Sequence, residues 1–531
     1  MGKKIGIDLG TTYSCVACVD DDGRVRILDN AEGEQTTPSV VFISNGEVVV
    51  GSTARAEGGL NPENIVERVK NHMGDPDYTL FVDGEEYSPA AISKLILEKL
   101  FRDAKDALGE DVDGAIVTCP AYFGEHARNA TKLAAEKAGI NVLQILDEPT
   151  AASLAYGYSR HEDMQKTILI YDLGGGTFDI TVMKLNFVGD RREMEVITTG
   201  GDHLLGGKDW DAALTNYVTE EFCSITGCDQ DEMKNDPECI QMFSENTEKV
   251  KKLLTSKESA SMTVTFDGQK EKIEITRAKF EEITESLLNQ TITLIGNTLD
   301  AKNLSINDID EIILVGGSTR MPQVRARLEA EYGKPVSSFE PDKAVAMGAA
   351  LMASYANYAT QTTSAGAEAK GGGTMSLGGS ASEFTDAQGR EFVVKIKCTK
   401  SYGVAANDPN TGARRISNII LKDTEKPCKC TVGFQAASNN QSSALVEIFE
   451  NDSLDQVCDE ELGRKMYEDS DISFGESVAK GTPIDVSLIM DENGILTVEL
   501  SVNGGAPKVV TPIRIGNDTN EIGMDTRLAL Q

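Results

Sequence analysis

Two short segments of the sequence combine an aspartate with a glycine-containing turn. The first is Asp8-Leu9-Gly10, followed by two threonines, and the second is Asp172-Leu173-Gly174, followed by two more glycines. Each comes directly after a run of aliphatic residues that predicts a buried strand. In such a turn the backbone N–H groups are not covered by side chains and can bind phosphate oxygens. The aspartate lies where a hydrated divalent cation would sit beside the phosphate.

A single turn of this kind is weak evidence, because glycine-rich β-turns without any ligand are at least as common. The repetition favours the ligand, since two equivalent lobes would then face one nucleotide. A third segment supports this interpretation: a buried strand ends in Gly316-Gly317-Ser318, and Pro322 is placed to open a helix. Glycine there permits close approach of the backbone to a sugar or a planar base. We therefore expect an adenosine site beside the phosphate loops.

The elements that must position these residues divide the chain into parts. Over residues 1–358, strand patterns alternate with long amphipathic segments, which predicts an α/β nucleotide-binding domain with mixed sheets. Residues 359–390 are rich in Gly, Ser, Thr and Ala and predict a flexible linker. Residues 391–517 contain mainly strand signals and predict a β-rich domain, and residues 518–531 form a tail with no amphipathic helix.

Composition excludes several classes of function. A chain of 531 residues is long enough for two or more domains. Its formal charge of −34 argues against nucleic acids and anionic membranes as partners. No apolar run reaches membrane-spanning length, and the chain enters a strand at once with no signal peptide. The ten cysteines are scattered and interpreted as structural thiols, so we expect a cytoplasmic protein.

Seven segments, in order, resemble the seventy-kilodalton heat-shock chaperone family (heat-shock protein 70, DnaK type), within the actin/sugar-kinase/chaperone ATPase superfamily. They are GIDLGTTYSCV, VTCPAYFGEHARNATKLAAEKAGI, DEPTAASLAYGY, YDLGGGTFDI, GGDHLLGGKDWD, VGGSTRMPQV and PDKAVAMGAA. The resemblance implies an α/β fold: a two-lobed, actin-like ATPase made of duplicated ribonuclease-H-like domains. A β-sandwich-like domain that binds extended peptide would follow, although that part of the resemblance is thinner.

The resemblance also implies roles for individual residues. The catalytic set would be Lys70, Glu148, Asp172 and Thr177. The metal shell, for Mg²⁺ and K⁺, would include Asp8, Asp172 and Asp179. The phosphates of ATP or ADP would be bound by Gly10, Thr11, Thr12, Tyr13, Gly174, Gly175, Gly176, Gly206 and Gly207. The adenosine would be bound by Glu248, Lys251, Lys252, Thr255, Gly316, Gly317, Ser318, Arg320 and Asp342. Pro120, Arg128 and the Asp147-Glu148-Pro149 segment resemble a relay between nucleotide state and domain rotation.

The sequence departs from the family pattern at two places. The family's linker is a run of leucines between acidic residues that docks on the ATPase domain, whereas this chain has its Gly/Ser-rich stretch there. The family's helical lid over the peptide has no counterpart in the sequence. A smaller departure is that Lys252 and Thr255 replace the usual arginine and serine. These features leave the coupling between ATPase and β-rich domain open.

We therefore expect an ATP-binding, slowly hydrolysing, chaperone-like protein whose cleft opens and closes with nucleotide. Its partners would be unfolded or extended polypeptides, a co-chaperone and a nucleotide-exchange protein. The alternative is a nucleotide-gated binding or scaffold protein with one dedicated partner. A small-molecule kinase is the third hypothesis, and it would require a substrate pocket opposite the γ-phosphate.

Overall fold

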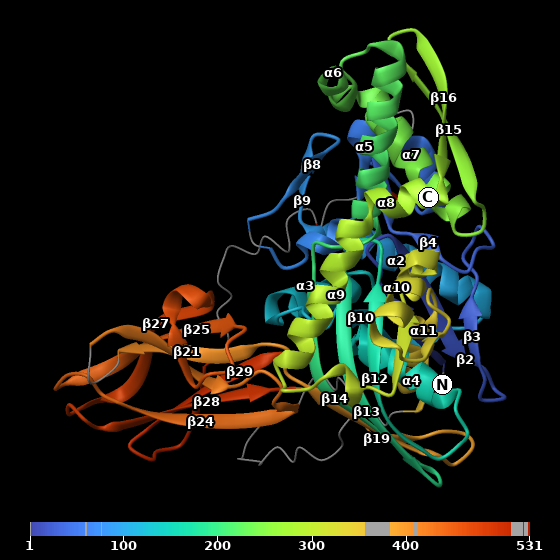
Figure 1. Cartoon of the computed structure of the whole chain (residues 1–531). Coiled ribbons are helices and arrows are strands. Elements are labelled where there is room, and N and C mark those ends of the chain that lie inside the picture. The colour runs from blue at the N-terminus through green and yellow to red at the C-terminus, as the bar shows by residue number, and fades with distance from the viewer. Residues whose placement is uncertain are drawn as a thin grey trace.

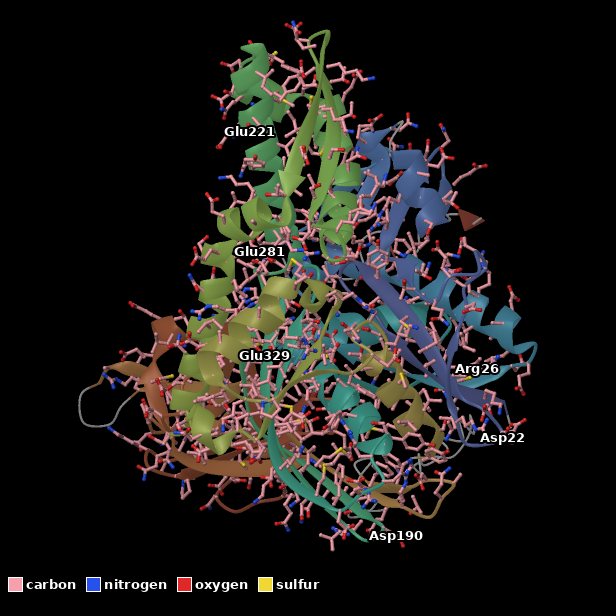
Figure 2. The ribbon with its side chains drawn as sticks, turned by 45° about the vertical axis from the view of Figure 1, so that its right-hand side comes forward. Asp22, Arg26, Asp190, Glu221, Glu281 and Glu329 are labelled. Atoms are coloured by element: carbon pink, nitrogen blue, oxygen red, sulfur yellow. The ribbon has the colours of Figure 1, made fainter. Side chains whose placement is uncertain are left out.

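The computed structural model describes residues 2–58, 61–75, 77–355, 383–407, 412–510, 524 and 529–530. Figure 1 shows two stacked α/β lobes with a β-domain (orange to red) to one side. The first lobe is built mainly from residues before 160, and the second mainly from residues after 163. Figure 2 shows acidic side chains such as Glu221 and Glu329 projecting from the helices of the second lobe, in keeping with the formal charge of −34.

The first lobe contains a sheet in the order β11-β10-β1-β2-β3, with β4 paired to β2. Strands β1, β2 and β3 are antiparallel neighbours, and β10 and β11 add in parallel on the other side of β1. The bounds are β1 Lys3–Asp8, β2 Tyr13–Val19, β3 Val25–Leu28, β4 Thr37–Pro38, β10 Val112–Cys119 and β11 Val142–Asp147. A smaller sheet contains β5 Val40–Ser44, β6 Glu47–Val50 and β7 Ile65–Glu67, and a hairpin pairs β8 Leu80–Val82 with β9 Glu85–Tyr87.

The second lobe contains a sheet in the order β18-β17-β12-β13-β14, extended by β20 and β19. Here β12, β13 and β14 are antiparallel neighbours, and β17 and β18 add in parallel beside β12. The bounds are β12 Met164–Leu173, β13 Phe178–Val188, β14 Arg191–Asp202, β17 Glu311–Val315 and β18 Val336–Ser338. The separate hairpin of β15 Ser259–Phe266 and β16 Gln269–Thr276 packs against the helices above.

The two main sheets thus have the same topology, and each begins with the strand that carries an Asp-Leu-Gly turn. Asp8 lies opposite Cys15 in the β1–β2 hairpin, and Asp172 lies opposite Asp179 in the β12–β13 hairpin. The predicted α/β fold with duplicated lobes and a β-rich domain is confirmed. Because parallel strands require crossover connections, helices cover these sheets.

The helices of the first lobe are α1 Ser52–Gly58, α2 Pro89–Leu108, α3 Glu125–Lys137 and α4 Glu148–Tyr158. Those that follow are α5 Gly207–Thr226, α6 Gln230–Asn235, α7 Pro237–Leu254, α8 Arg277–Ile283, α9 Glu285–Asp300, α10 Pro322–Tyr332 and α11 Ala344–Tyr355. Helices α4 and α11 pack together between the lobes. Gly348 allows this, because a Cβ there would lie 1.7 Å from the carbonyl oxygen of Ala151. The lobes are therefore joined by closely packed helices.

The strands β19 Glu383–Thr385 and β20 Glu391–Lys397 correct two predicted boundaries. Residues 383–390 were expected in the flexible linker, and residues 391–397 were expected to begin the β-rich domain. Instead β20 pairs in parallel with β14, and β19 pairs with β20. The reason is apolar burial: the side chains of Phe384 and Phe392 stack, and both pack into the core shared with α4 and β13.

Two consequences follow for the linker. The chain does carry an apolar strand docked on the second lobe, and this strand lies after the Gly/Ser-rich stretch. Cross-strand ion pairs such as Lys395–Glu193 (2.6 Å) support the pairing of β20 with β14. The hairpin turn is held by Arg390, which pairs with Asp386 and donates to the carbonyl oxygen of Tyr158 (3.1 Å). Residues 359–382 of the predicted linker lie outside the described residues.

The remaining described strands form two sheets packed around one apolar core. The orders are β26-β22-β21-β25-β27 and β24-β28-β29-β30. The bounds are β21 Ser401–Asn407, β22 Arg414–Ile420, β24 Cys428–Gln435, β25 Gln441–Asn451, β26 Val457–Asp459, β27 Arg464–Val478, β28 Pro483–Met490, β29 Leu496–Val502 and β30 Lys508–Val510. The short strand β23 Glu425–Lys426 pairs with β20 and links this sandwich to the second lobe. The turn at Asp491–Gly494 connects β28 and β29, with the Gly494 N–H donating to the Asp491 carbonyl (3.1 Å).

Little of the predicted tail over 518–531 lies within the described residues. Met524 is buried in the apolar core of the first lobe, and β31 Ala529–Leu530 pairs in parallel with β6. This part of the sequence therefore returns to the first lobe. Within the described chain, no helix is both long enough and apolar enough to span a membrane.

Candidate functional site

A cavity of about 1120 Å³ lies between the two lobes. It is lined by both Asp-Leu-Gly turns and by the Gly316–Ser318 segment, so three segments far apart in sequence meet there. Every predicted site residue lines this cavity except Gly176, Gly206 and Asp179. Asp179 is buried directly behind the second turn, where its backbone pairs with that of Asp172. The interpretation of the repeated turns as parts of one site therefore agrees with their placement.

The two turns contact each other, and their different sequences are complementary. A Cβ on Gly175 would lie 1.9 Å from Oγ1 of Thr12, and one on Gly176 would lie 2.6 Å from Cγ2 of Thr11. The glycines of the second turn thus leave the room that the threonines of the first turn occupy. Gly206 leaves room for the second turn from the other side, because a Cβ at this position would lie 2.5 Å from the backbone of Gly176. Gly176 and Gly206 therefore shape the two turns from behind.

Helix α5 holds the second turn in place through its own N-terminus. The N–H of Gly207 donates to the carbonyl of Gly174 (3.0 Å), and the N–H of Lys208 donates to the carbonyl of Gly175 (2.8 Å). The hydroxyl of Ser318 also donates to the Gly174 carbonyl (2.9 Å). Because these carbonyls are bound from behind, the open side of the turn faces the cavity.

Asp8 and Asp172, which line the cavity, form an acidic centre with Asp179, which lies behind the second turn. Burial, reinforced by the charge of Glu148, raises the pKa of Asp8 to about 7 and that of Asp179 to about 8. The same two causes raise the pKa of Asp172 well above its usual range. A cluster of buried carboxyl groups with raised pKa values is expected where a cation binds.

Lys70 is the cation that this centre does contain. It lies in the short 3₁₀ helix Val69–His72, it is 5% exposed, and its ammonium group pairs with the carboxylate of Glu148. Burial opposes the charged form, but Glu148 and Asp8 outweigh it and raise the pKa of Lys70. Glu148 is the first residue of α4, and Pro149 follows it as expected for a helix start. Lys70 thus faces the cavity from the 3₁₀ helix, and Glu148 faces it from the start of α4.

The residues fit a hydrated divalent cation better than a directly coordinated one. Oδ1 of Asp179 is buried with no hydrogen-bond partner in the described chain, which leaves an acceptor aimed at a missing donor or cation. Yet no three acidic, His or Cys side chains among the described residues are arranged to ligate a metal together. Mg²⁺ commonly keeps several waters and uses one or two carboxylates with substrate phosphates. The aspartates match that mode of binding.

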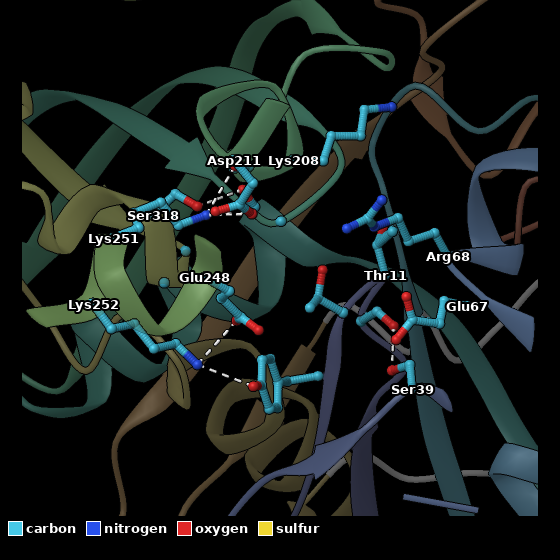
Figure 3. A pocket seen from close by; sticks show the side chains of 18 of the residues that line it. Thr11, Ser39, Glu67, Arg68, Lys208, Asp211, Glu248, Lys251, Lys252 and Ser318 are labelled. Atoms are coloured by element: carbon cyan, nitrogen blue, oxygen red, sulfur yellow. Dashed lines mark hydrogen bonds and ion pairs between the residues drawn. The ribbon is translucent and has the colours of Figure 1, made fainter. Parts of the chain in front are cut away.

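On the adenosine side, Lys251 is held by internal contacts. Its ammonium group donates to the Gly207 carbonyl (2.8 Å) and pairs with Asp211 (2.8 Å). Figure 3 shows this cluster next to Ser318. Lys251 therefore fixes helix α7 against α5. Asp211 was not predicted, because no sequence pattern pairs it with a lysine forty residues away.

Lys252 and Glu248 bridge the mouth of the cavity. Lys252 pairs with Glu248 (2.9 Å) and donates to the hydroxyl of Tyr13 in the first lobe (3.0 Å), as Figure 3 shows. Arg55, from α1, donates to the same hydroxyl (2.8 Å) and lies 3.5 Å from Glu248. Arg55 was not predicted, because its role arises only from the contact between the lobes.

The remaining residues predicted for adenosine also line the cavity. Arg320 pairs with Asp342, and the Nε to Oδ2 distance is 2.9 Å. Gly316 has a φ of +83°, and a Cβ there would lie 2.4 Å from Oδ1 of Asp172, so only glycine fits. Thr255 ends α7, with its hydroxyl donating to the Lys252 carbonyl (2.7 Å). The wall thus offers a planar guanidinium beside exposed backbone, as recognition of a nucleoside requires.

Comparison with known proteins agrees with this architecture. A family model described as "Hsp70 protein" matches residues 4–363. The "Chaperone protein DnaK" of Halobacterium salinarum is 36% identical over 511 residues, which cover 94% of this chain and 73% of that protein, and the DnaK from a second strain matches to the same extent. The chain is similar to these chaperones over most of its length. It belongs to the Hsp70 family.

Proposed function

We propose that the protein binds ATP with Mg²⁺ and hydrolyses it slowly to ADP and phosphate, as an ATP-dependent chaperone. The observation that carries the proposal is the single cavity lined by both Asp-Leu-Gly turns, with the Lys70–Glu148 pair at its base. In this proposal the backbone of the turns binds the phosphates, and the wall formed by Gly316, Arg320 and α7 binds adenosine. Membership of the Hsp70 family supports the same activity.

The chemistry assigned to the chain's residues is positioning and charge stabilisation. Lys70 approaches the terminal phosphate and offsets its charge, because its ammonium group already lies at the base of the cavity. Glu148, Asp172 and Thr177 order the attacking water on the in-line side. Asp8, Asp172 and Asp179 would hold Mg²⁺, and the same polar shell would accommodate K⁺. When bound, Mg²⁺ neutralises charge on the phosphate oxygens.

The β-domain is assigned the binding of unfolded or extended polypeptide. Supporting observations are its sandwich architecture and its exposed apolar side chains, among them Leu445, Val457 and Leu462. Its contacts with the lobes, described in the next subsection, offer a direct route of coupling. A co-chaperone and a nucleotide-exchange partner belong to the same proposal, since bound ADP must be released.

The test is the rate of phosphate release from ATP, measured with and without an unfolded peptide on the full chain. We expect a slow basal rate that increases when peptide is added. A basal rate that peptide does not change would favour the alternative, a nucleotide-gated protein with one dedicated partner. Transfer of phosphate to a sugar in a screen of sugars would instead identify a small-molecule kinase.

A further inference from the structure

The sandwich contacts the first lobe at the strand that leads into Glu148. Oδ1 of Asn493, in the β28–β29 turn, accepts a hydrogen bond from the N–H of Ile145 (3.0 Å). The next residue, Gly494, has a φ of +78°, and a Cβ there would lie 2.9 Å from Cδ of Arg128. This turn therefore lies against β11 and α3 at close range, three residues before the catalytic carboxylate.

A buried lysine from the strand that leads into the sandwich, Lys426, also lies near the end of β11. Lys426, at the end of β23, is 6% exposed, and its ammonium nitrogen lies 3.9 Å from Oδ2 of Asp147. Asp147 is 5% exposed and is also paired with the guanidinium of Arg128, which is 2% exposed. Asp147 immediately precedes Glu148 and is the N-cap residue of α4. Two cations from different parts of the molecule thus share one carboxylate beside the ATPase site.

We propose that Lys426 is a positioning residue for ATP hydrolysis, which acts through Asp147 to hold Glu148 in its place. This inference rests on the proposed ATPase function. In this inference Lys426 supplies the second cation beside Asp147. Its contact with Asp147 would then connect the docking of the sandwich to hydrolysis.

The buried charges around Asp147 explain why the loss of Lys426 would affect this carboxylate. Asp147 provides the only carboxylate within 4 Å of Lys426 among the described residues. Arg128 donates to the Phe123 carbonyl through Nε (2.9 Å) and to Asp147 through Nη2. Its Nη1 has no hydrogen-bond partner in the described chain. Burial, together with the charge of Arg128, lowers the pKa of Lys426. Removing one member of such a buried set leaves another charge uncompensated, so Asp147 responds to the presence of Lys426.

The experiment compares Lys426→Met with Lys429→Met in the full chain. Lys429 is the matched control, because it lies three residues away on β24 and pairs with Glu499 at the surface of the sandwich (2.5 Å). We expect Lys426→Met to lower kcat for ATP hydrolysis about three- to tenfold and to leave KM for ATP within twofold, because the adenosine wall is not touched. Lys429→Met should leave both constants unchanged.

A double-mutant cycle with Asp147→Asn tests the route. If Lys426 acts through Asp147, then Lys426→Met has no further effect on kcat in the Asp147→Asn background. An equal loss in both backgrounds would overturn the proposal, and so would an unchanged kcat in Lys426→Met.

A second measurement does not depend on hydrolysis. Hydrogen exchange at the Ile145 amide reports on the β11–α4 junction, because that N–H is bonded to Asn493. We expect exchange there to be about tenfold faster in Lys426→Met than in Lys429→Met. Unchanged exchange would overturn the proposal even in an active enzyme. Absence of hydrolysis in the wild-type chain would contradict the proposed function instead, which keeps the two failures distinguishable.

Discussion

The two lobes have the same sheet topology but contribute different parts of the site. In the first lobe the turn after β1 carries the side chains of Thr11 and Thr12, whereas in the second the turn after β12 has three glycines before Thr177. The contacts between the turns explain the difference, because Gly175 and Gly176 have no room for a Cβ against the threonines. A duplicated element has thus diverged so that its two copies fit together.

The chemistry is divided in the same way. The first lobe contributes the Lys70–Glu148 pair, and the second contributes Asp172, Thr177 and the adenosine wall. The comparison teaches that the two lobes share one geometry at the cleft and differ in side chains. On the proposed function, the first lobe contributes the cation that offsets phosphate charge, and the second contributes water-ordering residues and the binding of the nucleoside. Four experiments test this division.

The largest effect is expected from Lys70→Met, which removes the cation of the first lobe from the base of the cavity. We expect kcat for ATP hydrolysis to fall about 100-fold or more, because the charge it offsets develops in the transition state. The affinity for ATP should change far less, since the second lobe binds the nucleoside. Phosphate release and calorimetric titration measure the two quantities. Lys184→Met, at an exposed position on β13, is the control. A normal kcat in Lys70→Met would contradict the role of Lys70 in offsetting the charge of the transition state.

The second experiment compares equivalent glycines of the two turns. A Cβ on Gly10 would lie 1.9 Å from the Tyr13 carbonyl oxygen, whereas the nearest atom to one on Gly174 is 3.6 Å away. We expect Gly10→Ala to lower the free energy of unfolding by about 1–3 kcal/mol, and Gly174→Ala to change it by less than about 0.5 kcal/mol. Urea denaturation followed by circular dichroism measures both. Equal effects would mean that the two turns are not packed differently.

The third experiment uses proton uptake by the acidic centre, to which both lobes contribute. The raised pKa values of Asp8 (about 7) and Asp179 (about 8) mean that the nucleotide-free protein holds protons there at pH 7. Binding of Mg²⁺ and ATP favours the charged carboxylates, so about one proton should be released at pH 7 and almost none at pH 9. Calorimetry in buffers of different ionisation enthalpy measures this release. Binding with no release at pH 7 would contradict the assignment of these residues to the metal shell.

The raised pKa values of Asp8 and Asp179 also determine how the stability of the nucleotide-free protein depends on pH. The folded pKa values exceed the ordinary value of 3.8, so the folded state binds more protons than the unfolded state between pH 4 and 8. The contribution of these two groups to the free energy of unfolding therefore falls as the pH rises through that range.

The smallest effect is expected at the bridge between the lobes. Tyr13→Phe removes the hydroxyl to which Arg55 of the first lobe and Lys252 of the second both donate. The loss of these hydrogen bonds should speed release of bound nucleotide about two- to tenfold. Stopped-flow measurement with a fluorescent ATP analogue gives the rate. Tyr332→Phe is the matched control, because that hydroxyl lies within the second lobe, and an equal change in both variants would exclude the bridge as the cause.

Much of the cleft could be predicted from the sequence, because its parts are short segments with local physical meaning. The Asp-Leu-Gly turns follow buried strands, and Pro322 opens a helix, as expected. These features depend on backbone geometry that a few neighbouring residues determine.

The contacts between distant segments could not be predicted in this way. Arg55, Asp211 and Lys426 act only because folding brings them to partners far along the chain. The placement of β20 was wrong for a related reason: a strand with alternating burial fits a sandwich or a lobe edge equally well. Only the apolar core beside β14 decides between them.

The most direct test of the central claim, that two diverged lobes hold one nucleotide, is calorimetric titration of the full chain with Mg²⁺–ATP. The wild type, Gly10→Ala in the first turn and Gly206→Ala behind the second turn are compared. We predict one ATP per chain, with weaker binding in both variants, because each substitution displaces one of two turns that share the ligand. Two ATP molecules per chain, or a variant in either lobe that binds as the wild type does, would contradict the account.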